Sequence, residues 1–225
     1  NSLVRSVEHL LREHAAWAAE QNEEEKARLR ARIEQEGGAD LPERYEALVA
    51  RIEERKRAAD RLPDEWRSEA VKLLDNANIT PASTRDLADH YLQSRKPGFK
   101  VGLFARAAAT AKESANRLSA FAADYAEKVE ANIVWHLRAQ LMKAAESCGA
   151  DTAPIDEALS RTLGRVGGEW LAEQVQNGAV VSGEYTLNYS KLIAAETKSM
   201  FRRTAFELID SIATVAGAAA DREVA

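Results

Sequence analysis

The sequence predicts an all-α protein, an elongated antiparallel helical bundle with long helices and two irregular loops. Two observations carry this prediction. Pro occurs 5 times and Gly 11 times in 225 residues, while Ala, Leu, Glu and Arg dominate, a composition typical of long helices. Apolar residues also recur every three or four positions over most of the chain, which is the spacing of one helix face. We expect a single helical domain over residues 1–225.

Residues 1–94 predict a first group of helices separated by short breaks. One apolar stripe runs from Leu3 to Trp17, and a second begins at Leu41 after the glycine pair of EGGAD. The sequence LPDEW at 62–66 predicts another stop. Asp64 is placed there as the N-cap of a new helix.

Residues 95–106 interrupt the helical pattern. Pro97, Gly98 and Gly102 all oppose an uninterrupted helix.

Residues 107–176 then predict a long helix followed by a return helix. Since a helix rises about 1.5 Å per residue, a continuous helix to about residue 147 is on the order of 60 Å long. A helix of this length does not fit within a compact globular domain and therefore favours an elongated one.

A second loop is predicted at residues 177–189, where Gly178 and Gly183 flank two valines. The last helix is expected over residues 190–220. Its apolar positions alternate three and four apart, as in a bundle or a coiled coil.

Composition limits the classes of function. The net charge is -5, whereas wholesale nucleic-acid binding usually requires a basic balance, so we expect no nucleic-acid partner. Cys148 is the single cysteine, which favours a reducing, cytoplasmic setting. No apolar run reaches the length of a membrane span, and we expect no signal peptide before the chain. The start at Asn1 without a methionine leads us to expect part of a longer protein.

No catalytic, cofactor-binding or metal-binding residue is predicted. The chain has no GxxxxGK[ST] phosphate loop, and the glycine cluster GRVGG at 164–168 lacks the following Lys and Ser/Thr. None of the four histidines has a Glu three residues before it, which a di-iron bundle requires. We therefore expect no enzyme activity and no cofactor on these residues.

The first interruption joins apolar side chains with positive charge. Five cations and no acidic residue occur between residues 95 and 112, in a chain of negative net charge. Such a pattern suits a membrane interface, where apolar groups enter the acyl boundary and cations meet anionic headgroups. The candidate membrane-binding residues are Lys96, Phe99, Lys100, Val101, Leu103, Phe104 and Arg106. The alternative is that the apolar side chains plug the end of the bundle while the cations are simply exposed.

The second interruption is the second choice for a membrane-contacting tip. Its candidate residues are Val180, Val181, Tyr185 and Leu187. An extended segment with this alternation can touch a membrane or a partner, and it can equally be a wide turn tucked against helix ends.

Five ordered segments of the chain resemble the helical region that follows the GTPase domain in bacterial dynamin-like proteins. They are HLLREHAAWAAEQNEEEKARL, LPDEW, LLDNANITPASTRDLADHYLQSRKPGFKVGLF, EKVEANIVWHLRAQLMK and GEYTLNYSKLIAAETK. They cover most of the chain, and they are a resemblance of ordered segments rather than of a catalytic signature.

The resemblance implies a stalk, made of neck and trunk, that links a GTPase head to a membrane-contacting tip. The family uses GTP-driven association of its heads to tether, fuse or remodel bilayers. By this resemblance GTP and Mg belong to a head domain outside these residues, and the partners are an anionic membrane surface, the protein's own GTPase domain and a second copy in a homo-oligomer. The expected location is peripheral to the inner face of the cell membrane. A structural helical module that binds other proteins is the alternative.

Overall fold

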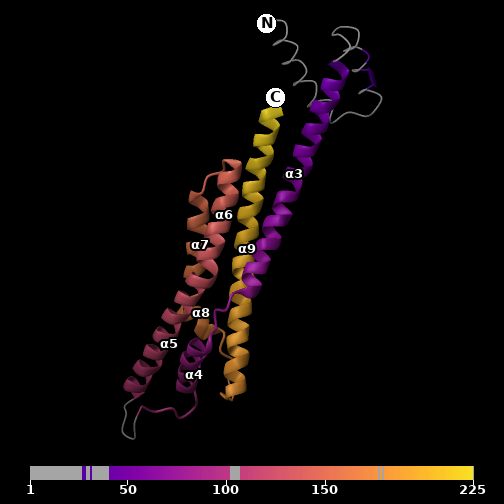
Figure 1. Ribbon diagram of the computed structural model, residues 1–225. Helices are drawn as coiled ribbons and strands as arrows, with labels where there is room; N and C mark the ends of the chain where they lie inside the picture. Colours follow the sequence, from indigo (N-terminus) through magenta and orange to yellow (C-terminus); the bar gives the residue numbers. More distant parts are fainter. Residues whose placement is uncertain are drawn as a thin grey trace. The chain divides into compact units, whose positions relative to one another are not determined.

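The fold was described from a computed structural model, which describes residues 27–28, 31, 41–101, 107–176, 178 and 180–224. All regular structure in these residues is helical, which confirms the predicted all-α fold (Figure 1). No helix among them has both the length and the apolar character that a membrane crossing requires. The helices are α3 (Leu41–Asn76), α4 (Ala82–Ser94), α5 (Ala107–Val129), the π-helical turn η1 (Glu130–Val134), α6 (Trp135–Cys148), α7 (Ala153–Gly164), α8 (Gly168–Glu173) and α9 (Gly183–Val224).

The chain divides into two compact units. Unit 1 comprises residues 1–65, 148–150 and 210–225, and within it the described backbone is mainly the first part of α3 and the last part of α9. The predicted helix at the start of the chain lies outside the described residues. Unit 2 comprises residues 66–147 and 151–209 and holds both interruptions that the sequence marks as candidate tips.

The core of unit 2 lies along one face of α5, η1 and α6. The side chains of this face are fully buried and follow one another at intervals of four: Phe121, Tyr125, Val129, Ile133, Leu137 and Leu141. This confirms the long helix predicted from residue 107 to about residue 147. Phe121 lies at the centre of an aromatic cluster, with ring centroids 6.4 Å from Tyr91, 6.0 Å from Tyr125 and 6.2 Å from Tyr189. Burial and ring contacts of this kind stabilise α4, α5 and α9 against one another.

The π-turn η1 explains how a strict spacing of four can stay buried. Four residues of an α-helix turn through about 400°, so each step carries the stripe about 40° around the helix. In η1 the N–H of Trp135 donates to the carbonyl of Glu130, five residues earlier, which widens the turn and brings the stripe back toward the core. The side-chain amide of Asn132 donates to the carbonyl of Lys128 at 2.9 Å, the group that its own N–H would bond in an α-helix.

Buried hydroxyl groups link neighbouring helices. The Tyr125 hydroxyl lies 2.9 Å from the Thr197 hydroxyl and donates to the carbonyl of Ile193, which joins α5 to α9. Tyr189 of α9 donates to the Leu171 carbonyl of α8 at 2.7 Å. Further links of α4 to α5, α9 to α4 and α7 to α9 are made by Thr84 with Asp124, Thr186 with Asp89 and Thr162 with Thr204.

Two predicted boundaries were wrong. The stop at LPDEW is absent, because α3 continues through Pro63. Proline has a helix-compatible φ, so the flanking turns continue at the cost of one hydrogen bond and a local clash, about 3 kcal/mol. The return helix expected up to Gln176 is instead two helices, since α7 ends at Gly164 and the short α8 begins at Gly168. Gly167 between them is extended, with φ -98° and ψ -177°.

Candidate functional site

The first interruption begins where α4 ends at Ser94. The N–H of Arg95 bonds the carbonyl of Leu92, and Gly98 then adopts a φ of +81°, which glycine reaches without the strain that a side chain would add. The N–H of Phe99 donates to the Lys96 carbonyl at 3.1 Å and closes a turn. The break predicted from Pro97 and Gly98 is therefore present, and it is built as an ordered turn.

The described residues of this turn present mainly cations to solvent. Arg95, Lys96 and Lys100 are exposed, Val101 is 52% exposed, and Phe99 is half-buried. Of the other predicted membrane-binding residues, Leu103, Phe104 and Arg106 lie outside the described residues. The membrane assignment of this whole set stays a prediction.

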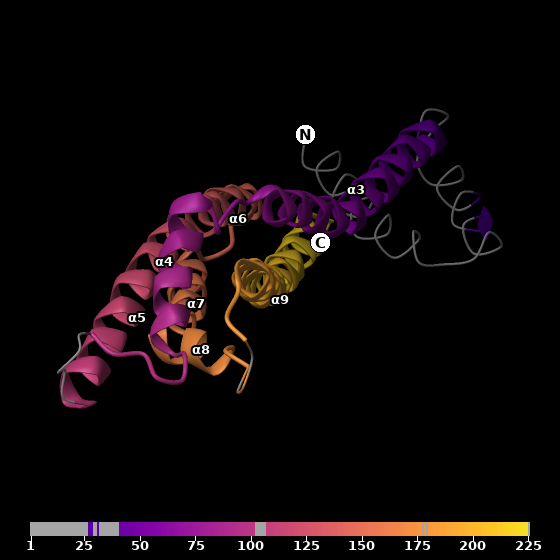
Figure 2. The same ribbon diagram turned by 90° about the horizontal axis from the view of Figure 1, so that it is seen from below.

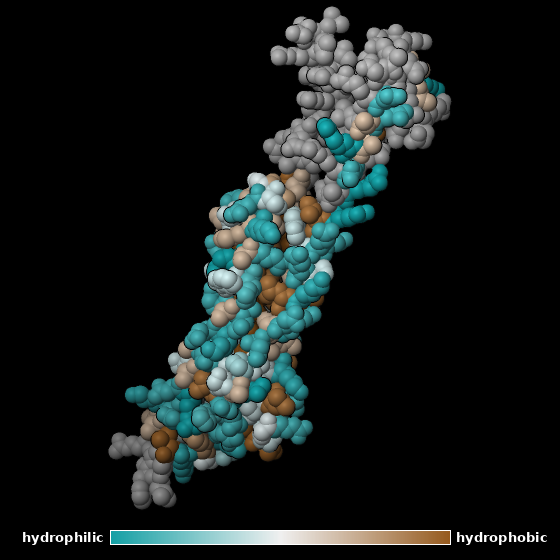
Figure 3. All heavy atoms as spheres, in the orientation of Figure 1, coloured by the Kyte–Doolittle hydropathy of each residue, from teal (hydrophilic) through white to brown (hydrophobic). Residues whose placement is uncertain are grey.

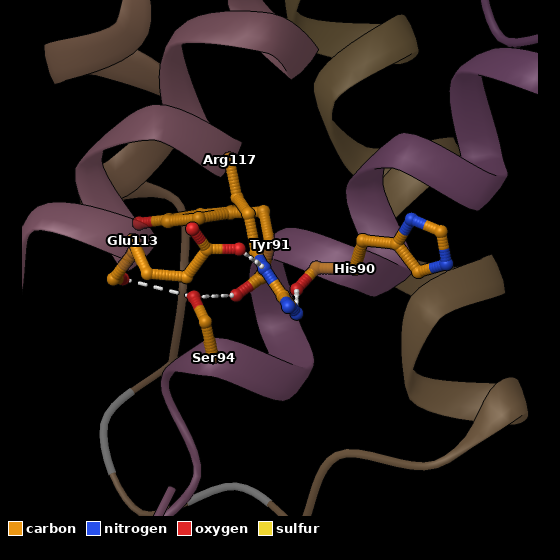
Figure 4. A network of polar contacts seen from close by, with 6 residues as sticks. His90, Tyr91, Ser94, Glu113 and Arg117 are labelled. Atoms are coloured by element: carbon orange, nitrogen blue, oxygen red, sulfur yellow. Dashed lines mark hydrogen bonds and ion pairs between the residues drawn. The ribbon is translucent and has the colours of Figure 1, made fainter. Parts of the chain in front are cut away.

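Arg117 of α5 holds the turn on the helices beneath it. Its guanidinium lies 5.1 Å from the centroid of the Phe99 ring, within cation–π range, and pairs with Glu113 at 2.9 Å. The same group donates to the backbone carbonyl of His90 at 3.1 Å (Figure 4). Ser94 donates to the Tyr91 carbonyl, as Figure 4 also shows, and its hydroxyl lies 2.8 Å from that of Ser114. Arg117 thus connects α4, α5 and Phe99 of the turn.

The second interruption is shorter than predicted. Helix α9 begins at Gly183, so Tyr185 and Leu187 lie in its first turns rather than in a loop at 177–189. The cause is a helix cap, because the Ser182 hydroxyl accepts the N–H of Tyr185 at 3.2 Å, which satisfies a donor of the first turn. Serine before Gly-Glu is a helix start signal in the sequence, and the predicted loop up to residue 189 was therefore too long.

The side chains of this segment differ strongly in exposure. Val180 is 85% exposed and Leu187 is 40% exposed, whereas Val181 is buried. Tyr185 is half-buried, and its hydroxyl accepts the N–H of Gln176 at 2.9 Å. Gly178 has a φ of +79°, which allows the chain to turn between α8 and α9. Val180 is therefore the main apolar group that this segment offers to solvent.

The two interruptions meet at one end of unit 2. They enclose an open groove of about 550 Å³. Residues 95–97 line one side, and the other side is formed by Val175, Gln176, Gly178, Val180, Val181 and Tyr185. Figure 2 looks at this end and shows the segment after α4 and the segment between α8 and α9. In Figure 3 apolar atoms appear among hydrophilic ones at the same end. We call this end, residues 95–101 and 175–187 as far as they are described, the tip.

The electrostatics of the groove favour anions. Arg95 and Lys96 contribute positive charge, and its described lining contains no carboxylate. No group of three or more His, Cys, Asp or Glu that could hold a metal ion occurs in the described part of the chain. What the tip offers chemically is a cationic and apolar surface that can bind an amphiphilic anion.

Sequence reasoning missed the contacts that assemble the tip. Arg117 lies 18 residues after Phe99, and nothing in the local pattern indicates their contact, because the contact depends on how α5 packs on α4. The meeting of the two interruptions also depends on tertiary packing. Because the two interruptions lie far apart in the sequence, no local pattern predicts that they come together.

The comparisons with known proteins point to one family. The chain is 34% identical over 141 residues to Dynamin-like protein A of Bacillus subtilis (strain 168), and the matched residues make up 63% of this chain. The chain spans only 12% of the length of that relative. No protein-family model matches the chain, and no solved structure matches it. The predicted resemblance to bacterial dynamin-like proteins is thereby confirmed.

Proposed function

We propose that this chain is the helical stalk and tip of a bacterial dynamin-like GTPase, and that its tip binds anionic membrane from the inner face of the cell membrane. In this proposal the helices couple a GTPase head, which binds GTP and Mg, to membrane remodelling or fusion. A second copy of the chain is a further expected partner. The similarity to Dynamin-like protein A supports the family, and the tip supports the membrane contact.

The observation that carries the membrane proposal is the pairing of cations with exposed valines at the tip. Arg95, Lys96 and Lys100 are exposed there beside Val101 and Val180, which are 52% and 85% exposed. Exposed cations next to anionic lipid contribute about 1 kcal/mol each, so three of them supply about 3 kcal/mol. That corresponds to roughly a hundredfold in affinity. Valine side chains that enter the acyl boundary add to this term.

Salt dependence follows from the same charges. The Debye length is about 10 Å at 0.1 M ionic strength and about 3 Å at 1 M, so exposed cations lose most of their attraction to lipid at high salt. The contribution of the valines is not electrostatic and persists. Binding by the tip is therefore expected to weaken with salt.

Co-sedimentation with liposomes tests the proposal. Vesicles of phosphatidylglycerol and phosphatidylcholine are compared with pure phosphatidylcholine vesicles across a salt series. We expect salt-sensitive binding to the anionic vesicles alone. The double variant Lys96→Glu, Lys100→Glu is expected to lose it, and Val101→Asp, Val180→Asp is expected to weaken it strongly. Lys72→Glu, Lys143→Glu is the matched control, because it makes the same change of charge at exposed helix positions outside the tip.

If the tip variant and the control variant lost vesicle binding equally, the proposal would be contradicted. Attraction of anionic lipid to the charge of the whole chain would then account for the binding. Absence of binding to anionic vesicles at low salt would remove the membrane assignment altogether. Circular dichroism of each variant shows that the helices remain folded.

The alternative, a structural helical module that binds other proteins, is favoured by one observation. Trp135, where η1 passes into α6, is 60% exposed and contacts His136 with its ring edge. Exposed aromatic side chains are enriched in protein interfaces. Crosslinking or light scattering of Trp135→Ala against the native chain tests this function. Loss of self-association in the variant, together with a native chain that does not bind anionic vesicles, is the supporting result.

A further inference from the structure

We propose that the groove of the tip is a binding site for the headgroup of a single anionic phospholipid, with its phosphate held by Arg95 and Lys96. This inference rests on the proposed function, and it adds a defined site to what a charged surface alone would do. A charged surface attracts any anionic bilayer. A groove selects one lipid molecule and binds it with fixed stoichiometry.

The charge of the groove is complementary to a phosphate. Arg95 and Lys96 are adjacent in sequence and line the same side, and the described lining carries no Asp or Glu to compete for them. Glu184, the acidic residue of the first turn of α9, is exposed and is not among the lining residues. A guanidinium binds phosphate through paired N–H donors, and an ammonium adds a point charge.

The opposite side offers a hydrogen bond and apolar contact. The Tyr185 hydroxyl uses its oxygen to accept the Gln176 N–H, which leaves its own hydrogen able to donate to a phosphate oxygen. Val175, Val180 and Val181 also line the groove and suit the glycerol carbons and the first carbons of an acyl chain. Binding sites for small molecules usually measure about 300 to 1,000 Å³, and a groove of about 550 Å³ lies within this range.

Burial and hydrogen bonds hold parts of the groove lining in place before any ligand binds. Val181 is buried, and the Ser182 cap fixes the start of α9 beside Tyr185. On the other side the N–H groups of Arg95 and Lys96 bond the carbonyls of Leu92 and Gln93. A preorganised site binds more tightly, because less conformational entropy is lost on binding.

Lys100 provides a matched control within the same turn. It is exposed and carries the same charge as Lys96, yet it does not line the groove. Adsorption to a charged surface predicts that Lys96→Ala and Lys100→Ala weaken binding equally. A headgroup site predicts that only the loss of Lys96 affects a single soluble lipid.

The experiment measures binding of dihexanoyl phosphatidylglycerol, below the concentration at which it forms micelles, by NMR shifts of backbone amides in the tip. Dihexanoyl phosphatidylcholine and inorganic phosphate are the comparison ligands. We expect saturable binding of the anionic lipid, weakened about fivefold or more by Lys96→Ala, since one lost cation contributes about 1 kcal/mol. We expect a change below twofold for Lys100→Ala. Tyr185→Phe is expected to weaken binding about fivefold, because a hydrogen bond contributes about 1 kcal/mol.

Several results would overturn the site. They are equal effects of the two lysine variants, inorganic phosphate binding as tightly as the short-chain lipid, and no saturable binding of that lipid. Any of these together with intact vesicle binding leaves the proposed membrane function standing without a headgroup site. Saturable lipid binding in a chain that ignores anionic vesicles supports the site and contradicts the proposed function. Failure of both measurements contradicts both.

Discussion

Buried tyrosines of unit 2 tie its stability to pH. Burial raises the pKa of Tyr91, Tyr125 and Tyr189 above the ordinary value of about 10. Above pH 10 the unfolded chain therefore releases protons that the folded chain keeps, so the free energy of unfolding falls as the pH rises. Below pH 10 both states keep these protons, and the contribution of each tyrosine to stability is complete.

The first prediction concerns Tyr125. At pH 7 Tyr125→Phe is expected to lower the free energy of unfolding by about 1 to 2 kcal/mol, because Thr197 and the Ile193 carbonyl lose a buried partner. Above pH 10 the variant is expected to lose stability less steeply, by up to about 1.4 kcal/mol per pH unit. Urea unfolding from pH 7 to 11 measures both effects. Parallel curves for the variant and the native chain would contradict this account.

Arg117 is the side chain that links the turn at residues 95–99 to the helices beneath it. Its loss in Arg117→Ala removes the contact with the Phe99 ring and the bond to the His90 carbonyl. We expect faster hydrogen exchange of the Phe99 amide, and a loss of unfolding free energy of about 0.5 to 1 kcal/mol. Arg161→Ala is the control, since its pair with Glu157 joins side chains that are 59% and 75% exposed. Such a pair contributes little to stability. Unchanged exchange at Phe99 would show that the turn is held by other contacts.

At the scale of a helix, η1 is the feature with the most direct test. Asn132→Ala removes the side-chain bond to the Lys128 carbonyl, and we expect a loss of about 0.5 to 1.5 kcal/mol in the free energy of unfolding. Asn116→Ala makes the same chemical change at an exposed position of α5. There the better helix propensity of alanine is expected to leave stability unchanged or slightly raised. If the two variants unfold at the same urea concentration, the π-turn does not need the side-chain hydrogen bond of Asn132.

The helices also show what sequence alone can predict. The long helix after residue 107 could be predicted correctly, because burial repeated along one face, here from Phe121 to Leu141, leaves a periodic pattern in the sequence. The continuation of α3 through Pro63 was not, since local propensity opposes it and only the surrounding structure decides. The start of α9 was placed too late, because the weight given to Gly183 hid the cap at Ser182.

At the scale of the whole molecule, the candidate site could be predicted only in part. The cations of the first interruption and the valines of the second are visible in the sequence, but their shared groove depends on packing that brings Arg95 and Val180 into one lining. The contact of Arg117 with Phe99 depends on packing in the same way. Interactions between residues far apart in sequence leave no periodic pattern, so the sequence indicates candidate residues but not how they are arranged.

The proposed membrane contact predicts that one end of unit 2 enters lipid. Val101→Cys and Glu146→Cys, each in a Cys148→Ala background, place an environment-sensitive fluorophore at the tip and near the end of α6. The long helical run of α5, η1 and α6 separates these positions. Anionic vesicles are expected to shift the emission of the label at 101 to the blue and to leave the label at 146 unchanged. Equal shifts at both positions would contradict contact through the tip, and phosphatidylcholine vesicles serve as the control.

The hydroxyl links between helices have a mechanical consequence. Sliding one helix by a single turn, about 5.4 Å, would separate several of them together and leave buried polar groups unsatisfied, at about 1 to 3 kcal/mol each. The links that resist such sliding are Thr84 with Asp124, Thr186 with Asp89, Tyr125 with Thr197 and Thr162 with Thr204. Under a force that slides neighbouring helices past one another along their axes, unit 2 should therefore resist deformation and then yield in a single step, because these hydrogen bonds break together.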